Sequence, residues 1–186
     1  MLAGKTILIG VTGGVAAHYI PEIIGQLRWR HLANVQVVMT PAATHFIAPL
    51  TLEVASGNPV YADLWKAAEH APVIHVQLAR LADLVLIAPA TADILAKLAH
   101  GLAGDLVALT VLATRAPVVL APAMHEEMWL KPVVQDNVAR LEEQGYQFVG
   151  PERGLSSTGE VAEGRIANIG AIISKLVAVS QGERRE

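Results

Sequence analysis

The 186-residue sequence contains no cysteine. This absence excludes disulfide bonds, thiolate metal sites and any mechanism that needs a thiol of the protein itself. Charged residues are also few, at 17% of the chain, and 14 Lys and Arg against 17 Asp and Glu leave a formal net charge of −3. This balance gives no broad basic surface, so we expect no nucleic-acid partner.

Long apolar runs are missing as well, although 53% of the residues are apolar. No run reaches the roughly 20 residues that a membrane-spanning helix needs, so we expect no membrane partner. The N-terminal MLAGKTILIGV lacks the pattern of a secretion signal and is instead typical of a β-strand. The composition indicates a cytoplasmic protein whose apolar surface is partly covered by partners.

Short, continuously apolar segments alternate with longer segments of helical period. We expect strands at 5–11, 35–40, 83–88, 118–120 and 146–149, and helices at 15–30, 75–81, from about 105, and 132–144. This alternation predicts a single α/β domain with a parallel sheet covered by helices on both faces. We place the domain at residues 1–180 and treat 181–186 as a charged tail.

Turns of small residues and hydroxyls follow four of the predicted strands. They are Thr12–Gly14, Thr40–Ala42, Pro89–Asp93 and Pro122–His125. Because ligands bind at the carboxyl ends of parallel strands, we expect these turns to converge on one crevice.

The first of these turns has two interpretations. Its backbone N–H groups are placed to bind a phosphate, but its glycines would also suit a tight turn with no ligand. The spacing of Gly10, Gly13 and Gly14 does not match G-x-G-x-x-G, and the second strand ends without an acidic residue. A dinucleotide such as NAD is therefore disfavoured, whereas a mononucleotide phosphate stays open.

Two of the seven histidines have positions from which they could reach the crevice. His75 begins a predicted helix before the third strand, and His125 follows a strand-end turn. The other five, His18 and His100 among them, are treated as structural, and no spacing typical of a metal site is present. Met128 could either cover a flat heteroaromatic ligand or fill the core.

Four segments taken together resemble the homo-oligomeric flavin-containing cysteine decarboxylases. They are ILIGVTGGVAA at Ile7–Ala17, IHVQLARLADLVLIAPATAD at Ile74–Asp93, APAMHEEMW at Ala121–Trp129 and GLSSTGEVAEGRIA at Gly154–Ala167. This family includes phosphopantothenoylcysteine decarboxylase and the decarboxylases of ribosomally made peptides. The resemblance implies a Rossmann-like flavoprotein that forms homo-trimers, often assembled as dodecamers, with FMN at the subunit interface; FAD stays an alternative.

The resemblance also implies roles for particular residues. The family's active-site histidine falls on His75. The residues expected to contact FMN are Gly13, Gly14, Val15, Ala16, Thr40, Ala42, Thr91, Ala92, Asp93 and Ala123.

The chain departs from the family pattern at two positions. His125 replaces an asparagine that binds the substrate carboxylate, and Thr158 replaces a cysteine in the segment over the active site. A histidine can still donate a hydrogen bond to a carboxylate. We therefore assign His125 to catalysis and substrate binding, and Met128 and Thr158 to substrate binding.

The missing cysteine decides between two reactions of the family. In coenzyme A synthesis a lid cysteine donates the proton when the enethiol is reduced to a thiol, and a threonine hydroxyl is far too weak an acid for that task. We therefore expect oxidative decarboxylation of a peptide's C-terminal cysteine to an enethiol. The alternatives are a phosphopantothenoylcysteine decarboxylase with an altered lid and a non-catalytic regulatory flavoprotein; flavin prenyl transfer has no matching motif.

Overall fold

The computed structural model describes residues 2–65, 73–155, 159 and 161–182. Its centre is a parallel six-stranded sheet with the order β3-β2-β1-β4-β5-β6. The strands are β1 (Thr6–Val11), β2 (Asn34–Met39), β3 (Val60–Tyr61), β4 (Leu84–Ala90), β5 (Val118–Pro122) and β6 (Gln147–Phe148). This is the strand order of the Rossmann fold. Strands β1 to β3 follow one another toward one edge of the sheet and β4 to β6 toward the other, so the strand order reverses between β1 and β4.

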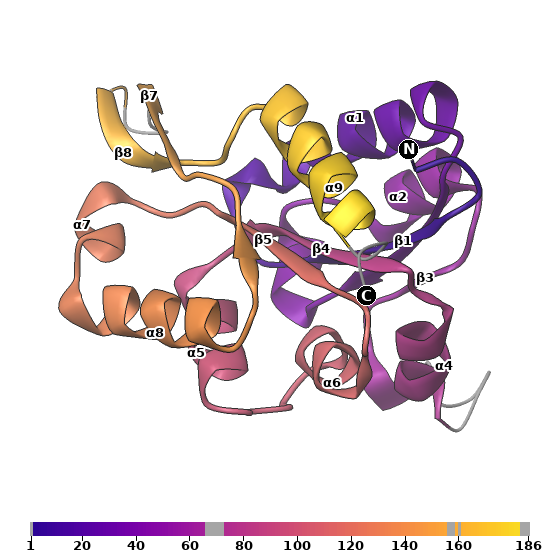
Figure 1. Cartoon of the computed structure of the whole chain (residues 1–186), viewed down its shortest axis with the longest axis horizontal. Coiled ribbons are helices and arrows are strands. Elements are labelled where there is room, and N and C mark those ends of the chain that lie inside the picture. Colours follow the sequence, from indigo (N-terminus) through magenta and orange to yellow (C-terminus); the bar gives the residue numbers. More distant parts are fainter. Residues whose placement is uncertain (1, 66–72, 156–158, 160, 183–186) are drawn as a thin grey trace.

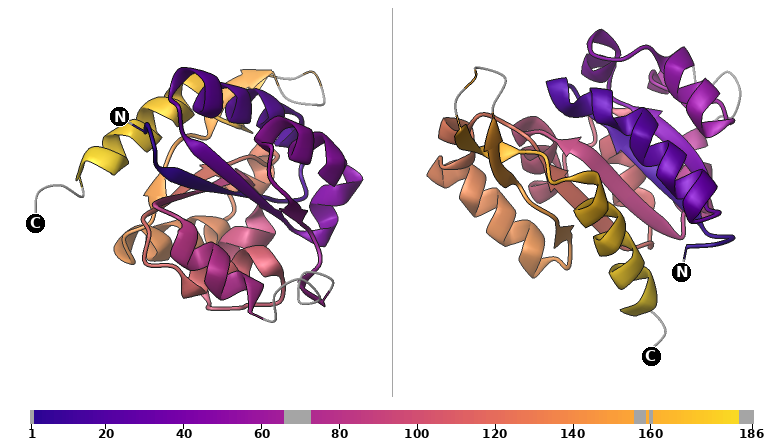
Figure 2. Two further views of the ribbon diagram at one scale, coloured as in Figure 1. Left: turned by 90° about the vertical axis from the view of Figure 1, so that its right-hand side faces the viewer. Right: turned by 90° about the horizontal axis from the view of Figure 1, so that it is seen from above.

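Helical segments cover both faces of the sheet (Figure 1). One layer contains η1 (Val15–Tyr19), α1 (Ile20–Gly25), η2 (Gln26–Arg30), η3 (Pro41–His45), α2 (Pro49–Ser56) and α9 (Ile169–Gly182). The other contains α4 (Ile74–Leu81), α5 (Ala92–Ala99), α6 (Leu106–Ala113) and α8 (Pro132–Glu143), and the short α7 (Glu126–Trp129) precedes α8. Figure 2 shows the sheet between these two layers.

Alternate residues of the buried strands supply two separate cores. Ile9 of β1 and Leu86 of β4 pack with Ile24 of α1 in the core beneath α1 and α9. Their neighbours Leu8 and Ile87 pack on the opposite face in the core beneath α4, α5, α6 and α8. Burial on both faces explains why these strands are continuously apolar in sequence. The predicted α/β fold with a doubly covered parallel sheet is confirmed.

Side-chain caps fix where two helices begin at the carboxyl edge of the sheet. The Thr91 hydroxyl accepts from the Ile94 N–H at 3.5 Å at the start of α5. An Asp105 carboxylate oxygen accepts from the Ala108 N–H at 2.9 Å at the start of α6. These bonds satisfy amides that have no partner within the helix. The loops after β4 and before α6 therefore have defined positions at the ligand edge.

Several elements were not foreseen from the sequence. The antiparallel hairpin of β7 (Glu152–Leu155) and β8 (Val161–Arg165) stands beside the main sheet, above α7 in Figure 1. The short β3 and the helix α9 also lack a predicted counterpart. α9 continues through Gly182 and so includes the first two residues of the predicted tail, while 183–186 lie outside the described residues. None of the described helices is long and apolar enough to cross a membrane.

Candidate functional site

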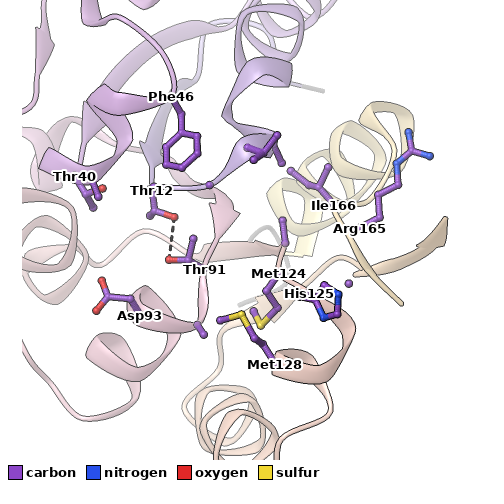
Figure 3. Close-up of a pocket in the computed structure, with 18 of the residues that line it drawn as sticks. Thr12, Thr40, Phe46, Thr91, Asp93, Met124, His125, Met128, Arg165 and Ile166 are labelled. Atoms are coloured by element: carbon purple, nitrogen blue, oxygen red, sulfur yellow. Dashed lines mark hydrogen bonds between the residues drawn. The ribbon is translucent and has the colours of Figure 1, made fainter. Parts of the chain in front are cut away.

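A large pocket lies at the carboxyl ends of β1, β2, β4 and β5, where the four predicted turns converge (Figure 3). Its volume is about 930 Å³, near the upper end of the range for small-molecule sites. Thr12, Thr40, Thr91 and Ala123 line it, one from the end of each strand. The pocket therefore occupies the point where the strand order reverses, which is the ligand site expected for this fold.

Threonine hydroxyls form the floor of the pocket. Thr12 is 1% exposed, and its hydroxyl donates to the Pro89 carbonyl oxygen at 2.5 Å. The hydroxyl oxygens of Thr12 and Thr91 lie 3.3 Å apart and are hydrogen bonded. Thr40 is 5% exposed and caps η3 by accepting from the Ala43 N–H at 3.3 Å. These hydroxyls are held by the backbone, so their positions are fixed before any ligand binds.

The two glycines of the first turn are glycines for different reasons. A Cβ at Gly13 would lie 2.6 Å from the Cβ of Ala42, so the close approach of the next turn requires glycine there. A Cβ at Gly14 would lie 3.4 Å from Pro89 and 3.5 Å from Thr91, which are ordinary contacts. The protein itself would accept a side chain at Gly14. The space left beside Thr91 is thus available to a ligand that approaches the backbone closely.

The opposite side of the pocket is formed by α7 and β8. The His125 ring nitrogen Nδ1 accepts from the Glu127 N–H at 3.4 Å and caps α7. A carboxylate oxygen of Glu126 accepts from the Glu163 N–H of β8 at 2.8 Å. Met128 is 48% exposed at this side of the pocket.

Gly164 allows β8 to approach the turn that carries His125. The Met124 N–H donates to the Gly164 carbonyl oxygen at 2.9 Å. Gly164 has a φ of +111°, and a Cβ there would overlap the Met124 carbonyl oxygen. A glycine at this position is therefore required both by the backbone conformation and by the close packing.

An ion-pair cluster borders the pocket on the side of α5 and α6. The Lys97 ammonium donates to carboxylate oxygens of Asp93 at 2.7 Å and of Asp105 at 3.0 Å. Burial on its own would lower the pKa of Lys97, but the hydrogen bonds and the charges of Asp93 and Asp105 outweigh it and raise that pKa above its usual value. The lysine is therefore charged and already neutralised by the protein.

The structure brings together every described residue that the sequence assigned to the cofactor. All ten line the pocket, and His125 and Met128 line it too. His75 is on α4, and it is not among the residues that line the pocket of its own chain. Thr158 lies outside the described residues. The chemical roles of these residues stay predictions.

Other lining residues were missed by the sequence reasoning. His18, which was treated as structural, lines the pocket, and its Nδ1 bonds to the Val15 carbonyl oxygen at 2.7 Å. Lys97 and Asp105 also line the pocket. Lys97 follows Asp93 by one helical turn, and this spacing in the sequence could have indicated the ion pair between them. Arg165 and Glu163 come from the unforeseen β8. No group of three or more potential ligands in the described part of the chain could hold a metal ion.

The sheet order and the pocket at its reversal point define a nucleotide-binding α/β protein of the Rossmann type. Within that class, the chain belongs to the Flavoprotein family, whose model matches residues 1–181. The family that the four sequence segments predict, and a flavin as the class of cofactor, are thereby confirmed.

The chain is also similar to curated proteins of coenzyme A biosynthesis. It is 46% identical over 165 residues to the coenzyme A biosynthesis bifunctional protein CoaBC of Vibrio vulnificus (strain YJ016), covering 89% of this chain and 41% of the relative. The chain therefore spans less than half the length of the curated relatives it matches.

Two solved structures are similar over nearly the whole chain. The FMN-dependent cysteine decarboxylase SpaF is 35% identical with a TM-score of 0.85, covering 97% of this chain and 99% of that one. A PPC decarboxylase mutant complexed with pantothenoylaminoethenethiol is 27% identical with a TM-score of 0.86, covering 96% and 99%. The predicted membership of a flavin-dependent decarboxylase family agrees with both.

Proposed function

We propose that this chain is an FMN-dependent decarboxylase that converts the C-terminal cysteine of a ribosomally made peptide to an enethiol. The decarboxylase class rests on the family and on the two solved structures described above. The choice of reaction within the class rests on one observation, which is that the chain contains no cysteine. The cytoplasmic location expected from the composition is part of this proposal.

The pocket fits a flavin mononucleotide in size and chemistry. The space left open at Gly14 admits a ligand against the backbone, and the hydroxyls of Thr12, Thr40 and Thr91 supply uncharged hydrogen-bonding groups nearby. When bound there, FMN would supply a two-electron acceptor for the substrate cysteine. The residues that we expect to hold it are the ten that the sequence assigned to the cofactor, all of which line the pocket.

The substrate reacts in two steps, an oxidation followed by a decarboxylation. The thiol-bearing carbon gives up a hydride equivalent and the sulfur gives up its proton, which leaves a thioaldehyde. The thiocarbonyl is β to the carboxylate and accepts the electron pair when the C–C bond breaks and CO2 departs. Protonation of the sulfur then gives the enethiol, and the two electrons leave with an external acceptor such as O2.

We assign to His125 the binding of the substrate carboxylate. Its Nδ1 accepts from the Glu127 N–H, so Nε2 is the ring nitrogen that carries the proton in the neutral tautomer. Nε2 can therefore donate to a carboxylate. Met128, one turn further along α7, would contact the rest of the substrate.

We assign to His75 the handling of a proton during the oxidation, a task for which an imidazole ring is the commonest side chain in enzymes. Its position outside the pocket of its own chain fits this role if the enzyme is a homo-trimer or a dodecamer with the site between subunits. His75→Asn should retain FMN but lose decarboxylation. Gly14→Asp should lose FMN but keep His75. Hybrid oligomers of the two variants should therefore regain activity, because one subunit supplies the FMN site and its neighbour supplies His75.

Failure of the two inactive variants to complement each other would contradict a shared site. The assembly itself is measured by light scattering. A mass near the 19.7 kDa of a single chain would contradict the proposed oligomer.

The product separates this function from the nearest alternative. A peptide ending in cysteine should lose CO2 and two hydrogen atoms, as read by mass spectrometry. Phosphopantothenoylcysteine should stop at the same oxidised stage, because Thr158 cannot supply the proton that a lid thiol would. A matched variant, Thr158→Cys, tests whether a thiol at that position restores the reduction.

A second function is favoured by the identity with the coenzyme A biosynthesis protein. A phosphopantothenoylcysteine decarboxylase would lose CO2 alone from that substrate and turn over repeatedly without oxygen. This outcome would replace the peptide reaction. Binding of FMN with no turnover of either substrate would instead favour the non-catalytic alternative.

A further inference from the structure

The ion-pair cluster of Asp93, Lys97 and Asp105 lies in the pocket, and two of its members, Lys97 and Asp105, have no part in the function described so far. Its members come from two segments, since Asp93 and Lys97 face each other across one turn of α5 and Asp105 begins α6. All three line the pocket. The sequence assigned only Asp93 to the cofactor.

The three side chains differ sharply in how firmly they are held. Asp105 is 5% exposed in its side chain, and its Oδ1 accepts from the Ala108 N–H while its Oδ2 accepts from Lys97. Lys97 is 26% exposed and is anchored to this buried carboxylate. Asp93 is 68% exposed, and its one side-chain hydrogen-bond partner within the described residues is Lys97, through Oδ2. A solvent-exposed aspartate is thus tied through a lysine to a rigid helix start.

The charge of the cluster limits what it can bind. Two carboxylates and one ammonium give a net charge of −1, and both carboxylates lie within hydrogen-bonding distance of the same Nζ. A phosphate dianion would be repelled, and Lys97 is not free to neutralise it. The Oδ1 of Asp93 makes no hydrogen bond within the described residues, so it is open to a donor group. The cluster therefore suits an uncharged hydroxyl or N–H of a ligand.

We propose that Lys97 and Asp105 are positioning residues that hold the Asp93 carboxylate so that it accepts a hydrogen bond from an uncharged donor of the bound flavin. The inference rests on the proposed FMN site. It also orients the cofactor, because the phosphate must lie away from this cluster and toward the turn at Gly14. In Figure 3, Asp93 and Thr40 lie on one side of the pocket, and His125 and Met128 lie on the other.

A simpler explanation is that Lys97 only compensates the buried charge of Asp105. In that case the lysine would matter for folding and not for the ligand. The two explanations make opposite predictions for a double variant in which both charges are removed. Such a variant has no uncompensated charge at Asp105, but it also has no anchor for Asp93.

The experiment measures FMN affinity by fluorescence quenching, and thermal unfolding of the ligand-free protein, for Lys97→Met, Lys97→Arg and Lys97→Met/Asp105→Asn. We expect Lys97→Met to lower both affinity, by about tenfold, and stability, because a charge-assisted hydrogen bond is lost. Lys97→Arg should keep both. The double variant should regain stability but keep the weak affinity.

Recovery of FMN affinity in the double variant would overturn the proposal in favour of charge compensation. Wild-type affinity in Lys97→Met would overturn it as well. Both results presuppose that the wild-type protein binds FMN, and a wild type that binds none would instead contradict the cofactor assignment. Riboflavin, which lacks the phosphate, should lose affinity in Lys97→Met by the same factor as FMN, since the cluster is assigned to uncharged groups.

Discussion

The two sides of the pocket are built in opposite ways. On one side, the hydroxyls of Thr12 and Thr40 are buried and hydrogen bonded to the backbone. On the other side, His125 caps a four-residue helix that contains Met128 and packs against strand β8 of the hairpin. The rigid side suits a constant ligand such as a cofactor, whereas the exposed side suits a substrate that differs between relatives. Of the two departures from the family pattern, His125 lies on the exposed side.

The largest effect is expected at Gly164, which joins the exposed side to the rest of the pocket. Gly164→Ala places a Cβ against the Met124 carbonyl oxygen at a positive φ and should lower the free energy of unfolding by about 3 kcal/mol. Urea denaturation measures the change. The control is Gly25→Ala in α1, where nothing lies near the added Cβ, and it should be neutral or slightly stabilising. Equal effects of the two substitutions would contradict the packing argument.

A second effect should separate the two glycines on the rigid side. Gly13→Ala should lower the free energy of unfolding by about 2 kcal/mol, because its Cβ would lie against Ala42. Gly14→Ala should leave unfolding nearly unchanged but weaken FMN binding, and Gly14→Asp should abolish the yellow colour of the purified protein. If Gly14→Ala lowered the free energy of unfolding as much as Gly13→Ala, glycine would be required at position 14 for packing and not for the approach of a ligand.

A smaller effect is expected when the floor loses one hydroxyl. Thr12→Val keeps the shape but removes the bonds to Pro89 and Thr91, and it should cost about 1 kcal/mol of unfolding free energy. FMN affinity should also fall, as measured by fluorescence titration. Thr44→Val serves as control, because the Thr44 hydroxyl bonds to the Pro41 carbonyl oxygen but does not line the pocket.

The smallest effect concerns pH. The pKa of Lys97 is raised in the folded protein, so its contribution to stability is complete below the ordinary value of 10.5 and is lost as the pH rises through the folded pKa. Lys97→Arg stays charged throughout this range. The wild type should therefore lose more unfolding free energy than Lys97→Arg above pH 10.5, as followed by urea denaturation. Identical alkaline profiles would show that the ion pairs do not stabilise the fold.

The rigid side could be predicted from the sequence because its signals are local. Continuous apolar strands followed by Thr-Gly-Gly, Thr-Pro-Ala and Pro-Ala-Thr-Ala-Asp identify the sheet and its ligand edge. The family resemblance of these segments then implied the ten lining residues that the structure brings together. The ends of the strands were predicted less accurately than their existence. Strands β4 and β5 run two residues further than expected, through Ala90 and Pro122. The proline in β4 hid the continuation, although it falls where the register with β5 shifts.

His125 and Met128 were predicted from the sequence, but the hairpin that completes the exposed side was not, because its contacts are distant in sequence. Strand β8 alternates exposed and buried residues over only five positions, and its attachment depends on Gly164 meeting Met124, forty positions earlier. Lys97 was overlooked for a similar reason, since its pairing with Asp105 depends on how α5 and α6 pack.

The hydrogen bond from the Met124 N–H to the Gly164 carbonyl oxygen has a practical consequence. It joins β8 to the turn that carries His125, so any separation of these two segments must break it. The exchange of this one amide hydrogen with deuterium would therefore report how often β8 separates from that turn. Comparing its exchange rate with that of the Ala43 N–H, which is held on the rigid side, would time the motions of the two sides within the same molecule.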